Sequence, residues 1–169
     1  KRLVNAYDGT WTGKGTEYGG LAGRTEATGY GIVFFAREVL KHCGESLKGK
    51  SVVISGFGNV AWGTALKLEE LGAKVVAFSG PDGYIYDEAG VLGEKIDYML
   101  DLRNSGKNVC APYAEKFAGS KFVAGKKPWG VKADLYIPCA MQNDIRIEDA
   151  KEMVANGVKY LIEGANMPT

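Results

Sequence analysis

The sequence has 169 residues, of which 46% are hydrophobic and 24% are charged, the balance of a globular protein with a sizeable core. Its 21 lysines and arginines nearly cancel its 20 aspartates and glutamates, so the net charge of +1 gives no reason to expect a nucleic-acid partner. No apolar run approaches the ~20 residues that a membrane-spanning helix needs, and no signal peptide is recognisable.

The cysteines and the histidine also narrow the chemistry. Cys43, Cys110 and Cys139 are far apart and form no C-x-x-C pair, which is typical of reduced thiols in a cytoplasmic protein and argues against a disulfide framework or a zinc site. His42 is the single histidine, so we expect no His-rich metal site and no His-dependent nucleophilic triad. Cys139 is therefore expected to be a small core residue and not a nucleophile.

The chain begins with a glycine-rich stretch. Residues 1–24 show no hydrophobic periodicity, which predicts a loop that either links or faces a ligand. Residues 25–43 turn helical, with Thr25 as the candidate cap and Gly44 as the stop. Because the sequence starts in a loop and stops just past an apolar strand, we expect it to be part of a longer polypeptide.

The next segment is the most informative. A predicted strand at 51–55 leads directly into Gly-x-Gly-x-x-Ala and then into a helical pattern that reaches Leu71. Gly56 allows a tight turn, Gly58 lets the backbone approach a pyrophosphate, and Ala61 lets the helix pack close to the strand. The pyrophosphate would lie on the helix N-terminus, where free N–H groups favour negative charge. The alternative is a tight turn that binds no ligand.

Strands and helices alternate through the rest of the chain. Residues 84–86 are too short to assign, and 80–83 reads as a turn. The remaining predicted strands are 74–79, 121–124, 133–139 and 159–163, and the remaining predicted helices are 94–104, 113–117 and 148–156. The alternation predicts an α/β fold with a doubly wound, mostly parallel Rossmann-type sheet, whose ligands bind beyond the carboxyl ends of the strands.

The end of the second strand bears on the choice of dinucleotide. An acid at this point commonly binds the adenosine ribose, but here the strand ends at Ser79, and Asp82 comes three residues later. No carboxylate repels a 2′-phosphate, and no lysine or arginine is visible nearby in sequence to attract one. The choice between NAD and NADP stays open, with a slight preference for NAD.

Three other segments are candidates for the same groove. The segments 138–143 and 163–168 each follow a predicted strand with small residues and amides, although ordinary turns use the same residue types. Before the first helix, Arg24 could grip a carboxylate with its planar donors and Thr28 could supply a hydroxyl. An arginine at a helix start is also a common surface residue.

Five motifs in this order resemble the glutamate dehydrogenases, and the hexameric bacterial type most closely. The resemblance runs the whole length of the chain, and 79–84 is similar to the clostridial NAD-dependent members. The motifs are Thr12-Gly13-Lys14-Gly15 with Gly19-Gly20, Arg24-Thr25-Glu26-Ala27-Thr28-Gly29-Tyr30-Gly31, Gly56-Phe57-Gly58-Asn59-Val60-Ala61, Pro138-Cys139-Ala140, and Gly164-Ala165-Asn166-Met167-Pro168.

The resemblance implies reversible oxidative deamination of L-glutamate to 2-oxoglutarate and ammonia by a homohexamer, with NAD or NADP as cofactor. It implies that Thr12 and Arg24 face the cleft between two domains. The residues that it assigns to the cofactor site are Thr28, Gly56, Gly58, Asn59, Val60, Ala61, Ser79, Ala140 and Asn166.

The resemblance also implies what the sequence lacks. Leu21 stands where family members usually carry a serine, and the family's catalytic lysines and aspartate would precede Lys1 in a substrate domain. We therefore expect 1–24 to be the tail of that domain with its connecting loop, and 25–169 to be a dinucleotide-binding Rossmann domain without catalytic residues.

Other functions remain open from the sequence. A related dehydrogenase acting on leucine, valine or phenylalanine would use the same hydride chemistry, and a sensor module would bind the dinucleotide without catalysis. An S-adenosylmethionine methyltransferase also has a glycine-rich turn, but it normally needs an acid at the second strand end, which Phe78 and Ser79 do not supply.

Overall fold

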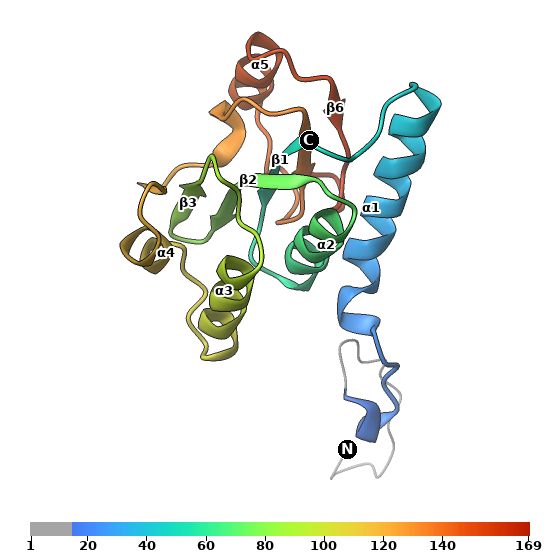
Figure 1. Cartoon of the computed structure of the whole chain (residues 1–169), viewed down its shortest axis with the longest axis vertical. Helices are drawn as coiled ribbons and strands as arrows, with labels where there is room; N and C mark the ends of the chain where they lie inside the picture. The colour runs from blue at the N-terminus through green and yellow to red at the C-terminus, as the bar shows by residue number, and fades with distance from the viewer. Residues whose placement is uncertain (1–14) are drawn as a thin grey trace.

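The structure is a computed structural model, in which residues 15–169 are described (Figure 1). Its centre is a six-stranded sheet in the order β4-β3-β2-β1-β5-β6. The strands are β1 (Ser51–Ser55), β2 (Lys74–Gly80), β3 (Gly83–Tyr86), β4 (Lys121–Ala124), β5 (Leu135–Pro138) and β6 (Tyr160–Leu161). The α/β class predicted from the sequence is confirmed.

The sheet is mixed. The pairs β1–β2, β1–β5 and β5–β6 are parallel, whereas β2–β3 and β3–β4 are antiparallel. The expectation that strand and helix alternate throughout is wrong at this point, because a two-residue turn, Pro81-Asp82, joins β2 directly to β3. So short a connection permits only antiparallel pairing.

Helices cover both faces of the sheet (Figure 1). Helices α1 to α4 contribute to a larger cluster of buried residues on one face, and α5 with the 3₁₀ turn η2 contributes to a smaller cluster on the other. The helices are α1 (Arg24–His42), α2 (Asn59–Glu70), α3 (Glu94–Asn104), α4 (Ala111–Lys116), α5 (Ile147–Ala155), η1 (Thr16–Tyr18) and η2 (Pro128–Gly130).

The central strands are buried on both faces, as parallel strands covered by helices usually are. In β1, Val52 and Ile54 join the larger cluster and Val53 joins the smaller one, as the alternation of a strand requires. Strand β2 carries one extra residue in this pairing, because Val52 lies opposite Val75 but Val53 lies opposite Ala77. Because of this bulge, the consecutive residues Val76 and Ala77 both join the smaller cluster.

Two glycines let α1 and α2 pack closely side by side (Figure 1). A Cβ on Gly29 would lie 2.6 Å from the backbone of Gly63 and of Val60, and a Cβ on Gly63 would lie 2.9 Å from the carbonyl oxygen of Glu26. The backbones of the two helices are therefore in direct contact, which fixes α1 against the first turns of α2.

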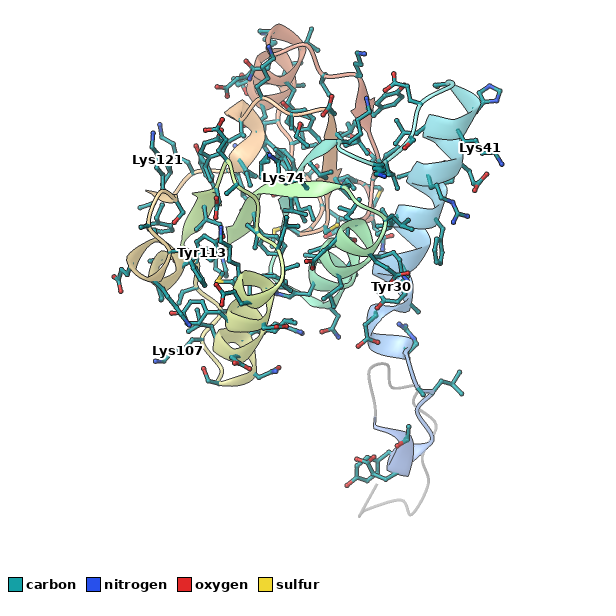
Figure 2. All side chains as sticks on the ribbon, viewed as in Figure 1. Tyr30, Lys41, Lys74, Lys107, Tyr113 and Lys121 are labelled. Carbon is teal, nitrogen blue, oxygen red and sulfur yellow. The ribbon has the colours of Figure 1, made fainter. Side chains whose placement is uncertain are left out.

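A buried carboxylate ties α3 and α4 to the end of β3. The side chain of Asp87 accepts hydrogen bonds from Lys95 Nζ (2.6 Å) and from the hydroxyl of Tyr113 (2.6 Å). In Figure 2, Tyr113 lies inside the molecule, whereas Lys41 and Lys121 lie at its periphery. Within residues 15–169, no helix is both long enough and apolar enough to cross a membrane.

Each helix and strand that the sequence predicted is present, β3 is additional, and the main differences lie at the ends of the elements. Helix α1 starts at Arg24 after Gly23, which has a φ of 73°, so Thr25 lies inside the helix and not at its cap as predicted. Strand β6 has two residues where five were predicted. The predicted loop contains the single turn η1 within its described part.

Candidate functional site

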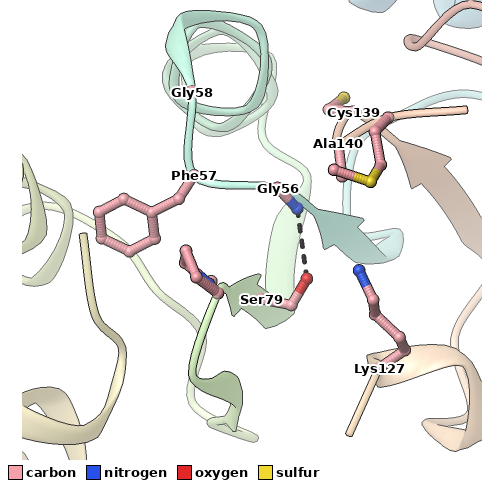
Figure 3. Close-up of a pocket in the computed structure, with 10 residues that line it drawn as sticks. Gly56, Phe57, Gly58, Ser79, Lys127, Cys139 and Ala140 are labelled. Atoms are coloured by element: carbon pink, nitrogen blue, oxygen red, sulfur yellow. Dashed lines mark hydrogen bonds between the residues drawn. The ribbon is translucent and has the colours of Figure 1, made fainter. Parts of the chain in front are cut away.

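The carboxyl ends of β1, β2 and β5 surround a pocket of about 240 Å³ (Figure 3). In a doubly wound sheet this edge is where ligands bind. Glycines and other small residues dominate its lining, which leaves backbone exposed to an occupant. The pocket is lined by Gly56, Phe57, Gly58, Ser79, Gly80, Pro81, Lys127, Cys139, Ala140 and Met141.

Gly56 is required by the fold itself. Its φ of +100° is a conformation that side chains with a Cβ rarely adopt, and a Cβ here would lie 2.8 Å from the carbonyl oxygen of Cys139. Its N–H donates to Ser79 Oγ at 3.2 Å, which joins the turn after β1 to the end of β2 (Figure 3). The turn therefore runs tightly between the two neighbouring strands.

Gly58 has a different reason to be glycine. Its φ is −85° and a Cβ at this position would meet no protein atom within 4 Å, so neither conformation nor packing excludes a side chain. Gly58 is the N-cap of α2, and the first N–H groups of a helix have no partner within the helix. The open space over Gly58 therefore gives an anion access to these donors.

Aromatic side chains of the larger core cluster support the turn that follows β1. The indole N–H of Trp62 donates to the carbonyl oxygen of Phe57 at 3.1 Å, and the Trp62 ring stacks on Phe78 with a centroid distance of 4.1 Å. Phe57 contacts Trp62 edge-on, at 5.2 Å between ring centroids. Buried polar N–H groups and ring pairs of this kind fix a backbone in one conformation.

The next three residues of the motif are not in the pocket lining. Asn59 begins α2 and its side-chain oxygen accepts a hydrogen bond from Arg103 of α3. Val60 packs against the larger core cluster, and Ala61 is completely buried. The predicted roles of these residues toward a cofactor stay predictions.

Asp82 is used by the fold. Its carboxylate accepts hydrogen bonds from the backbone N–H groups of Cys110 and Ala111, at 2.8 to 3.0 Å, where α4 begins. A carboxylate so placed satisfies free donors at a helix start and is not directed at a ligand. Among the described residues that line the pocket, none is acidic.

One cation, Lys127, reaches the pocket from the face of the sheet opposite α2. Lys127, just before η2, donates from Nζ to Asp144 Oδ1 at 2.6 Å, and its side chain is 45% exposed. The side chain of Asp144 is fully buried, and its other oxygen accepts a hydrogen bond from the hydroxyl of Ser55, the last residue of β1. Figure 3 shows the Lys127 ammonium group extending toward the middle of the pocket.

Two loops that were proposed to line one groove lie side by side. The N–H of Asn143 donates to the carbonyl of Met167 (3.1 Å), and the N–H of Ile145 donates to the carbonyl of Pro168 (2.8 Å). Ala140 lines the pocket, whereas Asn166 is exposed in the neighbouring loop and outside the lining.

Cys139 lies beneath these loops as a core residue. It is 6% exposed, and burial raises the pKa of its thiol to about 12, against the smaller effect of a hydrogen-bond contact with Thr64. A thiol in this state is protonated near neutral pH and is a poor nucleophile.

The predicted residues at the start of α1 are apart from the pocket lining. Arg24 and Thr28 are both exposed on α1. Thr12 lies outside the described residues. The structure thus brings Gly56, Gly58, Ser79 and Ala140 together and does not bring Arg24, Thr28 or Asn166 into the same lining.

Lys127 is the residue that sequence reasoning missed. The sequence showed no cation near the end of β2, yet the fold brings Lys127 to that edge through a partner 17 residues away. The only local signal is its position between β4, which ends at Ala124, and the turn that begins at Pro128. Nothing in that pattern indicates which face of the sheet the lysine reaches.

Comparison with known proteins identifies the family. Residues 19–169 match the family model described as Glutamate/Leucine/Phenylalanine/Valine dehydrogenase. The chain is 58% identical over 167 residues to the NAD-specific glutamate dehydrogenase of Bacteroides fragilis strain YCH46, covering 99% of this chain and 38% of the relative. It is 44% identical to the NADP-specific glutamate dehydrogenase of Haemophilus influenzae, covering 100% of this chain and 37% of the relative.

A solved structure titled glutamate dehydrogenase superposes with a TM-score of 0.89 at 56% identity, over 99% of this chain and 38% of the other. The chain thus spans a little over a third of the length of the relatives that it matches. The extent of the family match, together with the glycine turn between β1 and α2, shows that this chain belongs to the Glutamate/Leucine/Phenylalanine/Valine dehydrogenase family.

Proposed function

We propose that this chain is the coenzyme-binding part of a glutamate dehydrogenase, which interconverts L-glutamate with 2-oxoglutarate and ammonia. The bound nicotinamide would accept or return the hydride. In this proposal residues 1–24 are the end of a substrate domain with its connecting loop, and 25–169 form the dinucleotide-binding domain. The substrate and catalytic assignments rest on the names of the relatives, and the coenzyme assignment rests also on the geometry of the pocket.

Gly58 is the observation that supports coenzyme binding most directly. A glycine that neither conformation nor packing requires, at a helix N-terminus and beside a pocket, fits a diphosphate that approaches the backbone. The pocket of about 240 Å³ is smaller than the ~300–1,000 Å³ typical of small-molecule sites. It therefore fits the phosphates and an adjoining ribose, and the nicotinamide end would extend along the loops after β5 and β6.

Those loops and α1 complete the proposed site. Ala140 and Asn166 would line the nicotinamide half of the groove, and Thr28 and Asn59 would contact the dinucleotide. Arg24 and Thr12 would face the cleft where glutamate binds. These contacts require either the substrate domain or a bound coenzyme to bring the side chains together.

The proposed coenzyme preference is NAD. The relative with 58% identity is named NAD-specific, and the one with 44% identity is named NADP-specific. Asp82 is occupied at the start of α4, so discrimination by a carboxylate at the end of β2 is not available to this chain. The preference is then modest, and the ratio of initial rates with the two coenzymes would measure it.

A pair of glycine substitutions tests the coenzyme site. In a polypeptide of the relatives' full length that contains this chain, we expect Gly58→Ala to raise the dissociation constant for NADH about tenfold or more, since a methyl group would occupy the diphosphate's space. The free energy of unfolding should change by only about 0.5 kcal/mol, because the methyl group meets no protein atom. Calorimetric titration and urea unfolding measure the two quantities.

Gly56→Ala is the matched control for folding. It places a Cβ against Cys139 at a positive φ, so it should lower stability by about 1–3 kcal/mol and weaken NADH binding together. If Gly58→Ala left NADH affinity unchanged, the diphosphate would not lie over Gly58 and the proposed site would be wrong.

Activity separates the alternatives. Turnover of leucine or phenylalanine in place of glutamate would assign a different member of the family, and NADH binding without turnover of any amino acid would favour a sensor. A cytoplasmic homohexamer is the proposed form of the enzyme, supported by the resemblance to the hexameric bacterial type, and native mass spectrometry would measure its subunit number.

A further inference from the structure

Lys127 has no role in the proposed function so far, yet among the described residues that line the pocket it alone carries a charge. The other lining groups are backbone, a hydroxyl, a thiol and apolar side chains. A dinucleotide brings at least two negative charges on its diphosphate. An ammonium group in the same pocket is therefore the one side chain there that can balance them.

A hydrogen bond to a buried carboxylate fixes the position of Lys127. Asp144 is fully buried, so its carboxylate needs a partner for each oxygen, and Lys127 and Ser55 provide them. The loop that carries Asp144 is held in turn by Trp129, whose indole N–H donates to the Asp144 carbonyl oxygen at 3.1 Å. A lysine ammonium has three N–H donors, and the contact with Asp144 uses one of them.

The contact with Asp144 also determines which phosphate of the coenzyme the Lys127 ammonium group can reach. Ser55 immediately precedes Gly56, so the chain of contacts from Lys127 through Asp144 ends at the first residue before the glycine turn. The 2′-hydroxyl of the adenosine ribose is normally recognised farther out, at the end of the second strand. Lys127 is therefore tied to the part of the pocket where the diphosphate is expected.

We propose that Lys127 binds the diphosphate bridge of the dinucleotide from the side of the pocket opposite the N-terminus of α2, and that Asp144 is its positioning residue. This inference rests on the proposed function. The buried carboxylate offsets much of the lysine's charge, so the contact acts as a directed hydrogen bond more than as a net positive field. The same offset makes the pocket a weak attractor for an additional 2′-phosphate.

A matched pair of lysine substitutions tests the contact in the full-length polypeptide. We expect Lys127→Gln to raise the dissociation constants for NADH and for ADP-ribose about tenfold, and to leave that for adenosine unchanged, because adenosine has no phosphate. Lys126→Gln makes the same charge change at an exposed neighbour outside the pocket lining and should leave all three constants unchanged. Isothermal titration calorimetry gives the constants.

The role of Asp144 is tested by coupling. Asp144→Asn should weaken NADH binding several-fold in the unmodified background, because the ammonium loses its charged anchor. In the Lys127→Gln background it should have no further effect, since the group that it positions is gone. Additive effects would show that Asp144 acts only on the fold.

Each result distinguishes this inference from the proposed function. If the unmodified polypeptide fails to bind NADH, the proposed function is wrong. If it binds NADH normally and Lys127→Gln behaves like Lys126→Gln, only the role of Lys127 is wrong. A loss confined to NADPH would place the lysine at the 2′-phosphate and overturn the diphosphate assignment. Should Lys127→Gln fail to fold, the double variant Lys127→Gln/Asp144→Asn leaves no buried carboxylate without a cation, and the same loss of ADP-ribose affinity is expected from it.

Discussion

Burial separates the three cysteines into two kinds. Cys110 and Cys139 are buried, and burial raises the pKa of each thiol, to about 12 for Cys139, whereas Cys43 is exposed after α1. Reaction with an alkylating reagent requires the thiolate and access to it. We therefore expect brief treatment of the native protein with iodoacetamide to modify Cys43 and to leave the other two unmodified, as peptide mass spectrometry would show.

Denatured protein is the control for this experiment, since all three cysteines should then react. Rapid modification of Cys139 in native protein would mean that the end of β5 opens to solvent, which would contradict the tight contact of Cys139 with Gly56 and Gly164.

Single residues also show how far the sequence could predict the site. Gly56 and Gly58 were predictable because a turn between a strand and a helix has a local sequence pattern. Glycine occurs in it where the backbone turns sharply and where the backbone must stay accessible to a ligand. Asp82 was left open, because its partners at the start of α4 are 28 and 29 residues away. Lys127 was missed, because Asp144 is 17 residues from it and Ser55 a further 89 from Asp144. A local pattern cannot indicate contacts of such range.

The packing of α1 on α2 depends on the absence of one side chain. Gly29→Ala would press a methyl group against the backbone of Gly63 and Val60, so we expect a loss of about 1–3 kcal/mol in the free energy of unfolding. Gly31→Ala, two residues along the same helix, meets no atom within 4 Å and should stabilise the protein by about 0.5–1 kcal/mol, as alanine does in place of glycine in a helix. Urea unfolding monitored by circular dichroism compares the two variants.

Equal effects of the two alanines would show that α1 and α2 are free to separate. Because α2 also carries the glycine turn at its start, a displaced α1 should weaken coenzyme binding in Gly29→Ala and not in Gly31→Ala.

The sequence predicted helices and strands well where a hydrophobic pattern ran over several residues. It predicted them poorly where pairing with a neighbouring strand determines the structure. Helix α3 and strand β4 have the predicted bounds. Strand β3 could not be assigned from the three residues 84–86, and only its pairing with β2 and β4 makes it a strand. The bulge in β2 likewise depends on its neighbour, since Val76 looks like any other apolar strand residue in the sequence.

Across the whole molecule, Asp87 makes stability depend on pH. Burial raises the pKa of Asp87, but the hydrogen bonds from Lys95 and Tyr113 lower it by more, so its pKa lies below the ordinary value of 3.8. As the pH falls, Asp87 therefore takes up a proton at a higher pH in the unfolded chain than in the folded one. The stabilisation is fully present above the unfolded pKa and is lost as the pH falls through the folded pKa.

Asp87→Asn removes this dependence. At neutral pH we expect it to cost about 2–4 kcal/mol, because Lys95 loses its buried anionic partner. The difference in unfolding free energy between the variant and the unmodified protein should shrink below about pH 4 as Asp87 takes up its proton. Urea unfolding at pH 7 and at acid pH measures it, and a difference that stayed constant with pH would contradict the role of the charge.

The two buried indoles described above lie behind the pocket lining, Trp62 in the larger core cluster and Trp129 in the smaller one. Trp62 hydrogen-bonds to the turn at Phe57, and Trp129 hydrogen-bonds to the backbone of Asp144, whose side chain holds Lys127. Indole emission responds to the polarity and quenching groups of its surroundings. The two indoles are therefore intrinsic fluorescent reporters close to the site. A bound reduced nicotinamide, which absorbs where tryptophan emits, would quench their fluorescence without any label being attached.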